Sequence, residues 1–392
     1  MKRLLAFYLM RSVSFAGGAE RRFESLAQRV PRFNTEFVVV GYEEEKRFVK
    51  VPVAFTIPRA SPRKLLRLVI AGVRATRAAK CEGVYCYHSD YERVLVPSYI
   101  VSLICRKPFV TVVHDDTRRK LDSLGVIGLL RYELRNGKHR RIPSSLAEFS
   151  FQLIRRVAVR RSAACICVSR YSLGYAQNVL KAKNASISGN GVGGEWFVDA
   201  RPEKRFDAVF VGRMTRIKGI YTLINAWKRV VERLGFVQLL VIGPADSKDQ
   251  NKVAALIDRL GLVQSVVIRG FLQDDEELRL LVSSSRVFVL PSQREGFGLA
   301  VAEAMASGVP CVLSDIPAFA ENFGEAALMV PVEDSEALAN AIISILQDPA
   351  TAARLGENGR SLVRTMTWDV VAAREADIVR SLLQQASPTS AT

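Results

Sequence analysis

One segment in the second half of the chain combines acidic residues, glycines and an expected helix start. It reads PSQREGFGLAVAEAMASGVPCVLSD, residues 291–315. The apolar run VFVL before it predicts a strand, and Gly296 and Gly298 then allow a ligand to approach the backbone closely. We expect a helix to begin near Leu299, where backbone N–H groups without intrahelical partners form an anion site. The segment therefore predicts a binding site for a diphosphate.

Two glutamates, Glu295 and Glu303, lie on either side of that helix start. Glu295 falls at the tip of the loop. Glu303 falls about one turn into the helix, where its carboxylate can accept hydrogen bonds from a ribose diol. The residues alone also permit a simpler interpretation, in which Glu295 is a solvated loop residue and Glu303 lies on the helix surface.

A second segment, VFVGRMTRIKG at 209–219, places two cations between an expected strand and the next helix. The strand should end at Gly212, with Arg213 and Lys218 in the loop that follows. Two cations at such a connection can neutralise a diphosphate leaving group. Because the chain holds 56 lysines and arginines, the pair can also be read as ordinary surface residues.

Short apolar runs alternate with amphipathic stretches twice along the 392 residues. The runs before residue 190 are LLAFYLM, EFVVVGY, GVYCYH, FVTVVHDD and ACICVSR; those after residue 200 are DAVFVGRM, VQLLVIG, SVVIRGF, VFVLPS and PCVLSD. This alternation predicts two doubly wound α/β domains with parallel sheets. The Gly-rich, polar stretch ISGNGVGGEWFVDARPEKRF predicts the boundary between them, near 190–205.

Together, the two segments resemble one family. The patterns G-R-x(4)-K-G and E-G-F-G-L-x(3)-E-A-M-A-x-G-x-P are similar to those of the retaining nucleotide-sugar glycosyltransferases of the family-4 type, also called glycosyl transferases group 1. The resemblance covers nearly all of 206–370 and is thinner before that. Ala300 stands where family members often have proline or valine. The resemblance implies the GT-B fold, two Rossmann-like domains facing each other across a cleft.

The resemblance also implies roles for residues of the second domain. Arg213 and Lys218 match the pair that binds the donor diphosphate, and Glu303 matches the ribose-binding glutamate. Glu295 matches the glutamate near the anomeric centre of the donor sugar. The backbone of the stretch Gly296, Phe297, Gly298 and Leu299 matches the part that contacts sugar and phosphate.

In the first domain the resemblance rests on shorter motifs. Gly17 and Gly18, in GGAERRFESLA, match the glycine-rich loop that closes over the diphosphate. His114, at the end of FVTVVHDD, resembles a histidine directed at the donor sugar, and Asp115 or Asp116 could orient it. A packed or solvated histidine at a strand end is the alternative for His114.

The implied activity is that of a retaining hexosyltransferase, which moves a sugar from a nucleoside-diphosphate sugar to an acceptor. We expect no cofactor and no metal, since Arg213, Lys218 and the helix start near Leu299 supply positive charge. The expected domains are an acceptor-binding domain over residues 1–195 and a donor-binding domain over 196–370. Residues 371–392 are expected to form a helix that packs back toward the first domain, and then a disordered tail.

Charge is distributed unevenly within the net +17: residues 1–190 carry 35 Lys+Arg against 14 Asp+Glu. RKLLRLVIAGVRATRAAK, residues 63–80, predicts a basic amphipathic helix, with Arg63, Arg67, Arg74 and Arg77 on one face and Leu65, Leu66, Val69 and Val73 on another. Such surfaces bind anionic lipid. We therefore expect peripheral contact with the inner face of a membrane and a lipid-linked saccharide acceptor, as in cell-surface polysaccharide or glycolipid synthesis. Ordinary helices with solvated arginine rims are the alternative.

The start, MKRLLAFYLMRSVSFAGGAE, resembles a short secretory signal, but Arg11 interrupts its apolar run. We interpret it instead as the first strand and the Gly17-Gly18 loop of a cytoplasmic enzyme.

The six cysteines are expected to be reduced thiols, with Cys165 and Cys167 on opposite faces of one strand. A nucleotide-sugar epimerase and a non-catalytic membrane-associated partner are the alternative functions. Nucleic-acid binding is disfavoured, because no RNP-like or zinc-finger spacing accompanies the basic charge.

Overall fold

The computed structural model describes residues 1–9, 17–45, 52–58, 64–114, 142–197 and 202–386. The chain divides into two compact units. The first unit comprises Met1–Asn190 together with Trp368–Thr392, and the second is the continuous segment Gly191–Thr367. Asp115, Asp116 and Arg63, singled out above, lie outside the described residues.

A seven-stranded parallel sheet forms the centre of the first unit, in the order β3-β2-β1-β4-β5-β6-β7. Its strands are nearly continuous apolar runs, as expected for a parallel sheet covered on both faces; Leu4 to Leu9, for example, are fully buried. The strands are β1 (Lys2–Tyr8), β2 (Thr35–Tyr42), β3 (Val53–Ile57), β4 (Gly83–Cys86), β5 (Phe109–Val113), β6 (Ala164–Cys167) and β7 (Ala185–Ile187).

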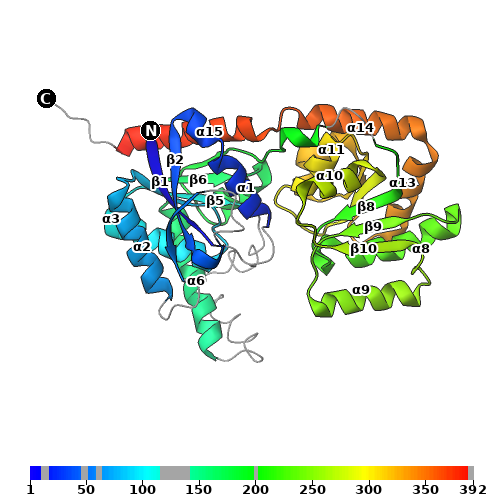
Figure 1. Cartoon of the computed structure of the whole chain (residues 1–392), viewed down its shortest axis with the longest axis horizontal. Helices are drawn as coiled ribbons and strands as arrows, with labels where there is room; N and C mark the ends of the chain where they lie inside the picture. Colours follow the sequence, from blue (N-terminus) through cyan, green and yellow to red (C-terminus); the bar gives the residue numbers. More distant parts are fainter. Residues whose placement is uncertain (10–16, 46–51, 59–63, 115–141, 198–201, 387–392) are drawn as a thin grey trace. The chain divides into compact units, whose positions relative to one another are not determined.

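Helices cover this sheet, and the last helix of the chain is among them (Figure 1). That helix, α15, packs against α1 and the short 3-10 helix η1. The helical segments described for the unit are α1 (Gly18–Ala27), η1 (Val30–Phe33), η2 (Glu43–Glu45), α2 (Lys64–Ala78), α3 (Glu92–Cys105), α6 (Ile142–Arg160), α7 (Arg170–Asn178) and α15 (Trp368–Ala386).

The second unit has a six-stranded parallel sheet in the order β10-β9-β8-β11-β12-β13. Its strands are β8 (Phe206–Val211), β9 (Leu239–Ile242), β10 (Val266–Gly270), β11 (Ser285–Leu290), β12 (Cys311–Ser314) and β13 (Ala327–Val330). The two ends of the unit lie side by side, since Val192 N donates to Met366 O at 2.8 Å and Val192 bridges Thr367.

Helix α8 (Ile220–Leu234) of the second unit buries one apolar stripe. Ile220, Leu223, Ile224 and Trp227 recur at helical spacing and are fully buried. The helical segments are η4 (Gly194–Trp196), η5 (Arg216–Lys218), α8 (Ile220–Leu234), α9 (Ser247–Arg259), α10 (Asp275–Ser283), α11 (Leu299–Ala306), α12 (Pro317–Phe323), η6 (Gly324–Ala326), α13 (Ser335–Gln347) and α14 (Pro349–Val363). Both units are thus doubly wound α/β structures, which confirms the predicted fold class.

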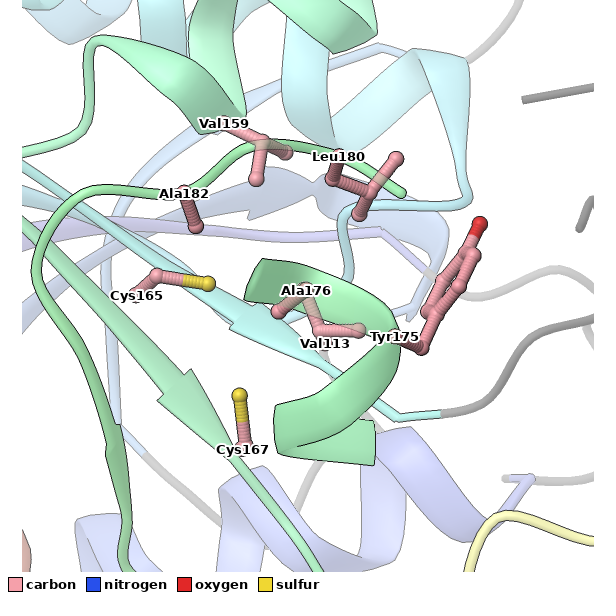
Figure 2. Close-up of a cluster of buried hydrophobic side chains, with 8 residues drawn as sticks. All are labelled: Val113, Val159, Cys165, Cys167, Tyr175, Ala176, Leu180 and Ala182. Atoms are coloured by element: carbon pink, nitrogen blue, oxygen red, sulfur yellow. The ribbon is translucent and has the colours of Figure 1, made fainter. Parts of the chain in front are cut away.

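The expected orientation of Cys165 and Cys167 was wrong. Both side chains lie on the same face of β6 and in the same buried cluster, with Val113, Tyr175 and Ala176 (Figure 2). The physical reason is the period of a strand: residues two apart share a face. All six cysteines are free thiols.

The α2 helix also differs from its expected pattern. Val69 packs into the core, but Leu65 and Leu66 are exposed to solvent by 46% and 52% of their surface. Leu66, Ile70 and Arg74 follow one another at four-residue steps, so they share one face of the helix. Apolar and basic side chains are therefore mixed on the exposed face rather than separated.

Candidate functional site

Lys218 and Glu295 form an ion pair at the carboxyl edge of the second sheet. Lys218 ends η5, which follows β8, and Glu295 lies in the loop that follows β11. These two strands are hydrogen-bonded neighbours, so the loops leave the same edge side by side. Lys218 Nζ lies 2.5 Å from Glu295 Oε1, and the side chains are 21% and 11% exposed. The structure therefore brings together one cation and one carboxylate from the two predicted segments.

Ser292 holds the same carboxylate from the other side. Its Oγ donates to Glu295 Oε1 at 2.9 Å, and the serine is fully buried. One carboxylate oxygen thus accepts from both an ammonium and a hydroxyl group, which fixes the orientation of the Glu295 side chain. Ser292 is part of the motif PSQREGFG, but its spacing from the other residues gave no reason to single it out.

The backbones of the two loops are in direct contact. Gln293 N donates to Ile217 O at 2.8 Å. Gly219, at the start of α8, has a φ of +76°, and a side chain there would place its Cβ 1.9 Å from Pro291 O. Only glycine fits this position, because any Cβ would collide with the backbone of the neighbouring loop. The final glycine of the G-R-x(4)-K-G pattern is therefore needed for the approach of Lys218 to Glu295.

A three-residue network closes the outer rim of these loops. Glu333 follows β13 and has the left-handed φ of +62°, which is uncommon for a residue other than glycine. Its Oε1 accepts from Gln293 Nε2 at 2.7 Å and from Arg216 Nη2 at 3.2 Å. Glu333 thereby joins the loop after β13 to the loops after β8 and β11. This role of Glu333 was not predictable from the sequence, because no spacing rule relates these three positions.

The start of α11 follows Glu295 directly. Gly298 caps the helix with a φ of +104°, and a side chain there would place its Cβ 2.7 Å from the ring of Phe319. Phe297 is buried and packs edge-on against Phe323 at a centroid distance of 5.3 Å. The side chain of Phe297 therefore belongs to the core, and only its backbone, with that of Gly296 and Leu299, is left for contact with a ligand.

Glu303 and Arg213 occupy contrasting environments. Glu303 lies in α11 and is only 7% exposed, so the interpretation that it is a helix surface residue was wrong. A buried carboxylate is costly unless it accepts hydrogen bonds. Arg213 is exposed in the loop between β8 and η5, and its carbonyl accepts from Thr215 N at 2.7 Å. The structure places Arg213 in the same loop as Lys218.

In the first unit, His114 directly follows β5. Its Nε2 lies 2.7 Å from Tyr87 O, and because a carbonyl can only accept, this nitrogen carries the proton. In the neutral ring Nδ1 is then the acceptor nitrogen. The ring of His88, which follows β4, lies 5.4 Å away between centroids. His114 is half-buried and held by the backbone of the neighbouring strand end.

Beside His88 lies a buried ion pair that the sequence analysis also missed. Asp90 Oδ1 and Arg155 Nη2 are 2.6 Å apart, and both side chains are at most 5% exposed. Arg155 also donates to Tyr175 Oη at 3.3 Å. The pair joins the loop after β4 to α6, which is a contact that no short motif could indicate.

Gly17 and Gly18 lie at the start of α1. Gly17 is the N-cap residue, and a side chain there would place its Cβ 2.8 Å from Glu20 Oε2. Gly18 is exposed, whereas Glu20, two residues further along the helix, is buried. The two glycines therefore leave the backbone at the start of α1 uncovered by side chains of their own.

Within the described ranges, no three histidine, cysteine, aspartate or glutamate side chains come together in a group that could hold a metal ion. No helix in the described part of the chain is long and apolar enough to cross a membrane.

Comparison with known proteins identifies the family. Residues 195–362 match Glycosyl transferases group 1, and residues 16–192 match Glycosyltransferase Family 4. The chain belongs to the group 1 glycosyltransferases of the family-4 type, which have the GT-B fold. This confirms the predicted family.

The individual relatives match only part of this chain. A phosphatidyl-myo-inositol mannosyltransferase of Mycobacterium leprae is 34% identical over 170 residues, which are 42% of this chain and 44% of the relative. The Mycobacterium tuberculosis enzyme of the same name is 30% identical over 254 residues, which are 60% of this chain and 64% of the relative. The alignments therefore span less than two thirds of either relative.

Solved structures agree in fold over almost the whole chain. Sucrose-phosphate synthase from Thermosynechococcus elongatus superposes with a TM-score of 0.75 at 22% identity and covers 98% of this chain and 100% of its own. The Anabaena protein HepE, solved in complex with UDP and glucose, superposes with a TM-score of 0.72 at 20% identity. The alignment covers 97% of this chain and 99% of HepE.

We predict that Ser292→Ala lowers the rate of sugar transfer by at least about tenfold, because a hydrogen bond to a charged group contributes roughly 1.5–3 kcal/mol. Turnover with saturating substrates measures the effect. Ser344→Ala on α13, which removes a hydroxyl bonded only to Ala341 O in its own helix, is the matched control. Equal rates for Ser292→Ala and wild type would show that the hydrogen bond from Ser292 to Glu295 does not contribute to sugar transfer.

Proposed function

We propose that this protein transfers a hexose from a nucleoside-diphosphate sugar to an acceptor with retention of the anomeric configuration. The observation that carries the proposal is the Lys218–Glu295 pair, held by Ser292 at a sheet edge directly before the start of α11. A carboxylate, an ammonium group and a helix N-terminus meet there. These are the groups needed at the sugar and at the diphosphate of such a donor.

The diphosphate is the group that Lys218 and α11 suit best. An ammonium group has three N–H donors, so Lys218 can keep its bond to Glu295 and still donate to phosphate oxygens. Arg213, exposed in the same loop, adds a second cation. The N-terminus of α11 adds the partial positive charge of the helix dipole. We propose that these groups stabilise the departing nucleoside diphosphate without a metal ion.

The two glutamates have separate roles in this proposal. Glu303, buried in α11, accepts hydrogen bonds from the ribose, and Glu295 acts at the donor sugar near its anomeric carbon. Glu295 is not assigned as a covalent nucleophile. The acceptor hydroxyl attacks the anomeric carbon from the face that the diphosphate leaves, through a transition state with oxocarbenium character. The bond between that carbon and the phosphate oxygen breaks, and the departing phosphate oxygen takes the proton of the hydroxyl. The negative charge of Glu295 stabilises that positive charge.

The first unit contributes Gly17, Gly18 and His114 in this proposal. Backbone N–H groups at the start of α1 bind the donor diphosphate in this proposal, since helix N-termini bind anions. His114 is directed at the donor sugar, where Nδ1, the acceptor nitrogen of its neutral ring, can receive a hydrogen bond from a sugar hydroxyl. HepE was solved with UDP and glucose, which supports a uridine nucleotide as one donor to test.

We predict that Glu295→Ala reduces transfer by at least about 100-fold, the scale of losing one transition-state electrostatic contact. A thermal-shift screen of nucleoside diphosphates and their sugars first identifies the donor, since a bound ligand raises stability by RT ln(1 + [L]/Kd). Transfer is then measured with EDTA present, and the product's anomeric configuration is read by NMR.

Glu232→Ala on the exposed face of α8 is the matched control for this variant and should transfer at the wild-type rate. Near wild-type turnover of Glu295→Ala would remove its catalytic role. Loss of wild-type transfer in EDTA would overturn the metal-free proposal, and an epimerised donor formed without acceptor would point to an epimerase.

A lipid-linked saccharide is the acceptor class we propose, with the enzyme at the cytoplasmic face of a membrane. The mycobacterial relatives are named for transfer of mannose to phosphatidyl-myo-inositol, which is a lipid. The exposed face of α2, formed by Leu66, Arg67, Ile70, Arg74 and Arg77, supports the proposal. Apolar groups among cations suit the boundary between acyl chains and anionic headgroups.

We predict that Leu66→Glu/Ile70→Glu lowers binding to phosphatidylglycerol vesicles at low salt by at least about tenfold, because it places charge on the apolar groups that enter the lipid. Vesicle flotation measures the bound fraction. Phe236→Glu, at a residue of the second unit that is 76% exposed, is the matched control and should bind like wild type. Absence of wild-type binding would disprove membrane contact.

A further inference from the structure

A fully buried arginine joins the first helix of the first unit to the last. Arg22 lies on α1 and Glu375 on α15, and their side chains are 1% and 2% exposed. Arg22 Nη2 lies 2.6 Å from Glu375 Oε2. Tyr85 of β4 donates its hydroxyl to the other oxygen of the same carboxylate. Burial and the charge of Glu375 raise the pKa of Tyr85 well above its ordinary value, so this hydroxyl stays protonated.

The same guanidinium also reaches the segment that leaves the first unit. Arg22 Nη2 donates to Ser188 Oγ at 2.6 Å and to Gly189 O at 3.3 Å. The chain passes into the second unit after Asn190 and returns at Trp368, where α15 begins. Arg22 therefore contacts both the departing segment and the returning helix of the first unit.

A network of this kind is poorly explained by stability alone. Burying two charges costs so much solvation energy that apolar residues of similar volume often give an equal or more stable core. The ion pair instead fixes the orientation of the groups that it joins, because a guanidinium donates hydrogen bonds along fixed axes in one plane. Here the guanidinium donates to Glu375 of α15, to Tyr85 Oη of β4 at 3.4 Å and to the segment after β7, so it defines how α1 lies against three other elements.

The position of Arg22 on α1 determines what this directionality controls. Arg22 lies one turn after Gly18, so it holds the first turn of the helix. We propose that Arg22 and Glu375 are positioning residues, which fix the start of α1 and its glycines for binding of the donor diphosphate. The inference rests on the proposed function. It makes α15 necessary for donor binding although Glu375 itself touches no donor.

Two variants test this, Glu375→Gln and the double variant Arg22→Met/Glu375→Met. The first removes one charge at constant shape, and the second removes both charges and keeps the core apolar. Asp369→Asn is the matched control on the same helix, because Asp369 pairs with Arg32 at 2.8 Å but is 53% exposed. Arg22→Lys keeps a cation but loses the planar fork, so it serves where another variant fails to fold.

Hydrogen exchange and donor kinetics are the readouts. In both Glu375 variants and in Arg22→Lys we expect the amides of Gly18–Ala27 to exchange at least about tenfold faster, while those of α8 stay unchanged. The donor KM should rise at least about tenfold, with kcat within about threefold, because the loss lies in donor binding. Asp369→Asn should match wild type in both measurements.

Either of two results would overturn the proposal. A double variant with wild-type exchange in α1 and a wild-type donor KM would show that the ion pair only fills space. Faster exchange in α1 with an unchanged donor KM would show that α1 is ordered by the pair but not for the donor. Failure of the wild type to use any nucleotide sugar would refute the proposed function instead, and the exchange measurement does not depend on that function.

Discussion

The candidate site depends on the close approach of two loops that leave neighbouring parallel strands. Pairing of β8 with β11 brings the loops to one sheet edge, but it does not bring their backbones into contact. That step requires Gly219, whose missing side chain leaves room for the carbonyl of Pro291. Once the backbones meet, Lys218 reaches Glu295 and Gln293 reaches both Ile217 and Glu333. The absence of a Cβ at Gly219 therefore permits the polar contacts that join these two loops.

The sequence was informative where local pattern decides structure. Apolar runs and glycines predicted the strand, loop and helix around Glu295 and the loop holding Lys218, because these depend on periodicity and backbone freedom over a few residues. Topology then brought the two segments together, since the carboxyl ends of parallel strands meet at one edge. The doubly wound fold was predictable for the same reason.

Contacts between distant segments were not predictable from one sequence. Arg22 and Glu375 are 353 positions apart, and no periodicity relates them. Ser292 lies within a recognised motif, yet only the folded loop shows that its hydroxyl faces Glu295. The exposure of Leu66 beside the arginines of α2 did not follow from the sequence, because amphipathic spacing shows which residues share a face, but not which face a neighbouring element covers.

The Lys218–Glu295 and Arg22–Glu375 ion pairs lie in different environments. Lys218 and Glu295 keep partial access to solvent, so a bound anion can compete for the ammonium group without exposing a bare charge to the core. Arg22 and Glu375 have almost no access, and separating them would leave charges without solvation. The first arrangement suits a site that exchanges ligands. The second suits a part of the fold that stays the same throughout.

The adjacent ends of the second unit have a consequence for how this architecture can diversify. Because Gly191–Thr367 is one continuous segment whose ends are hydrogen-bonded to each other, it is an insertion into the first unit, entered and left at one place. A homologous segment with the same spacing between its ends can replace it while β1 to β7 and α15 keep their own contacts. Recombination at the two points of the gene that encode these ends thus exchanges the second unit as a whole, and the two ends of the exchanged segment meet at one place in the folded chain.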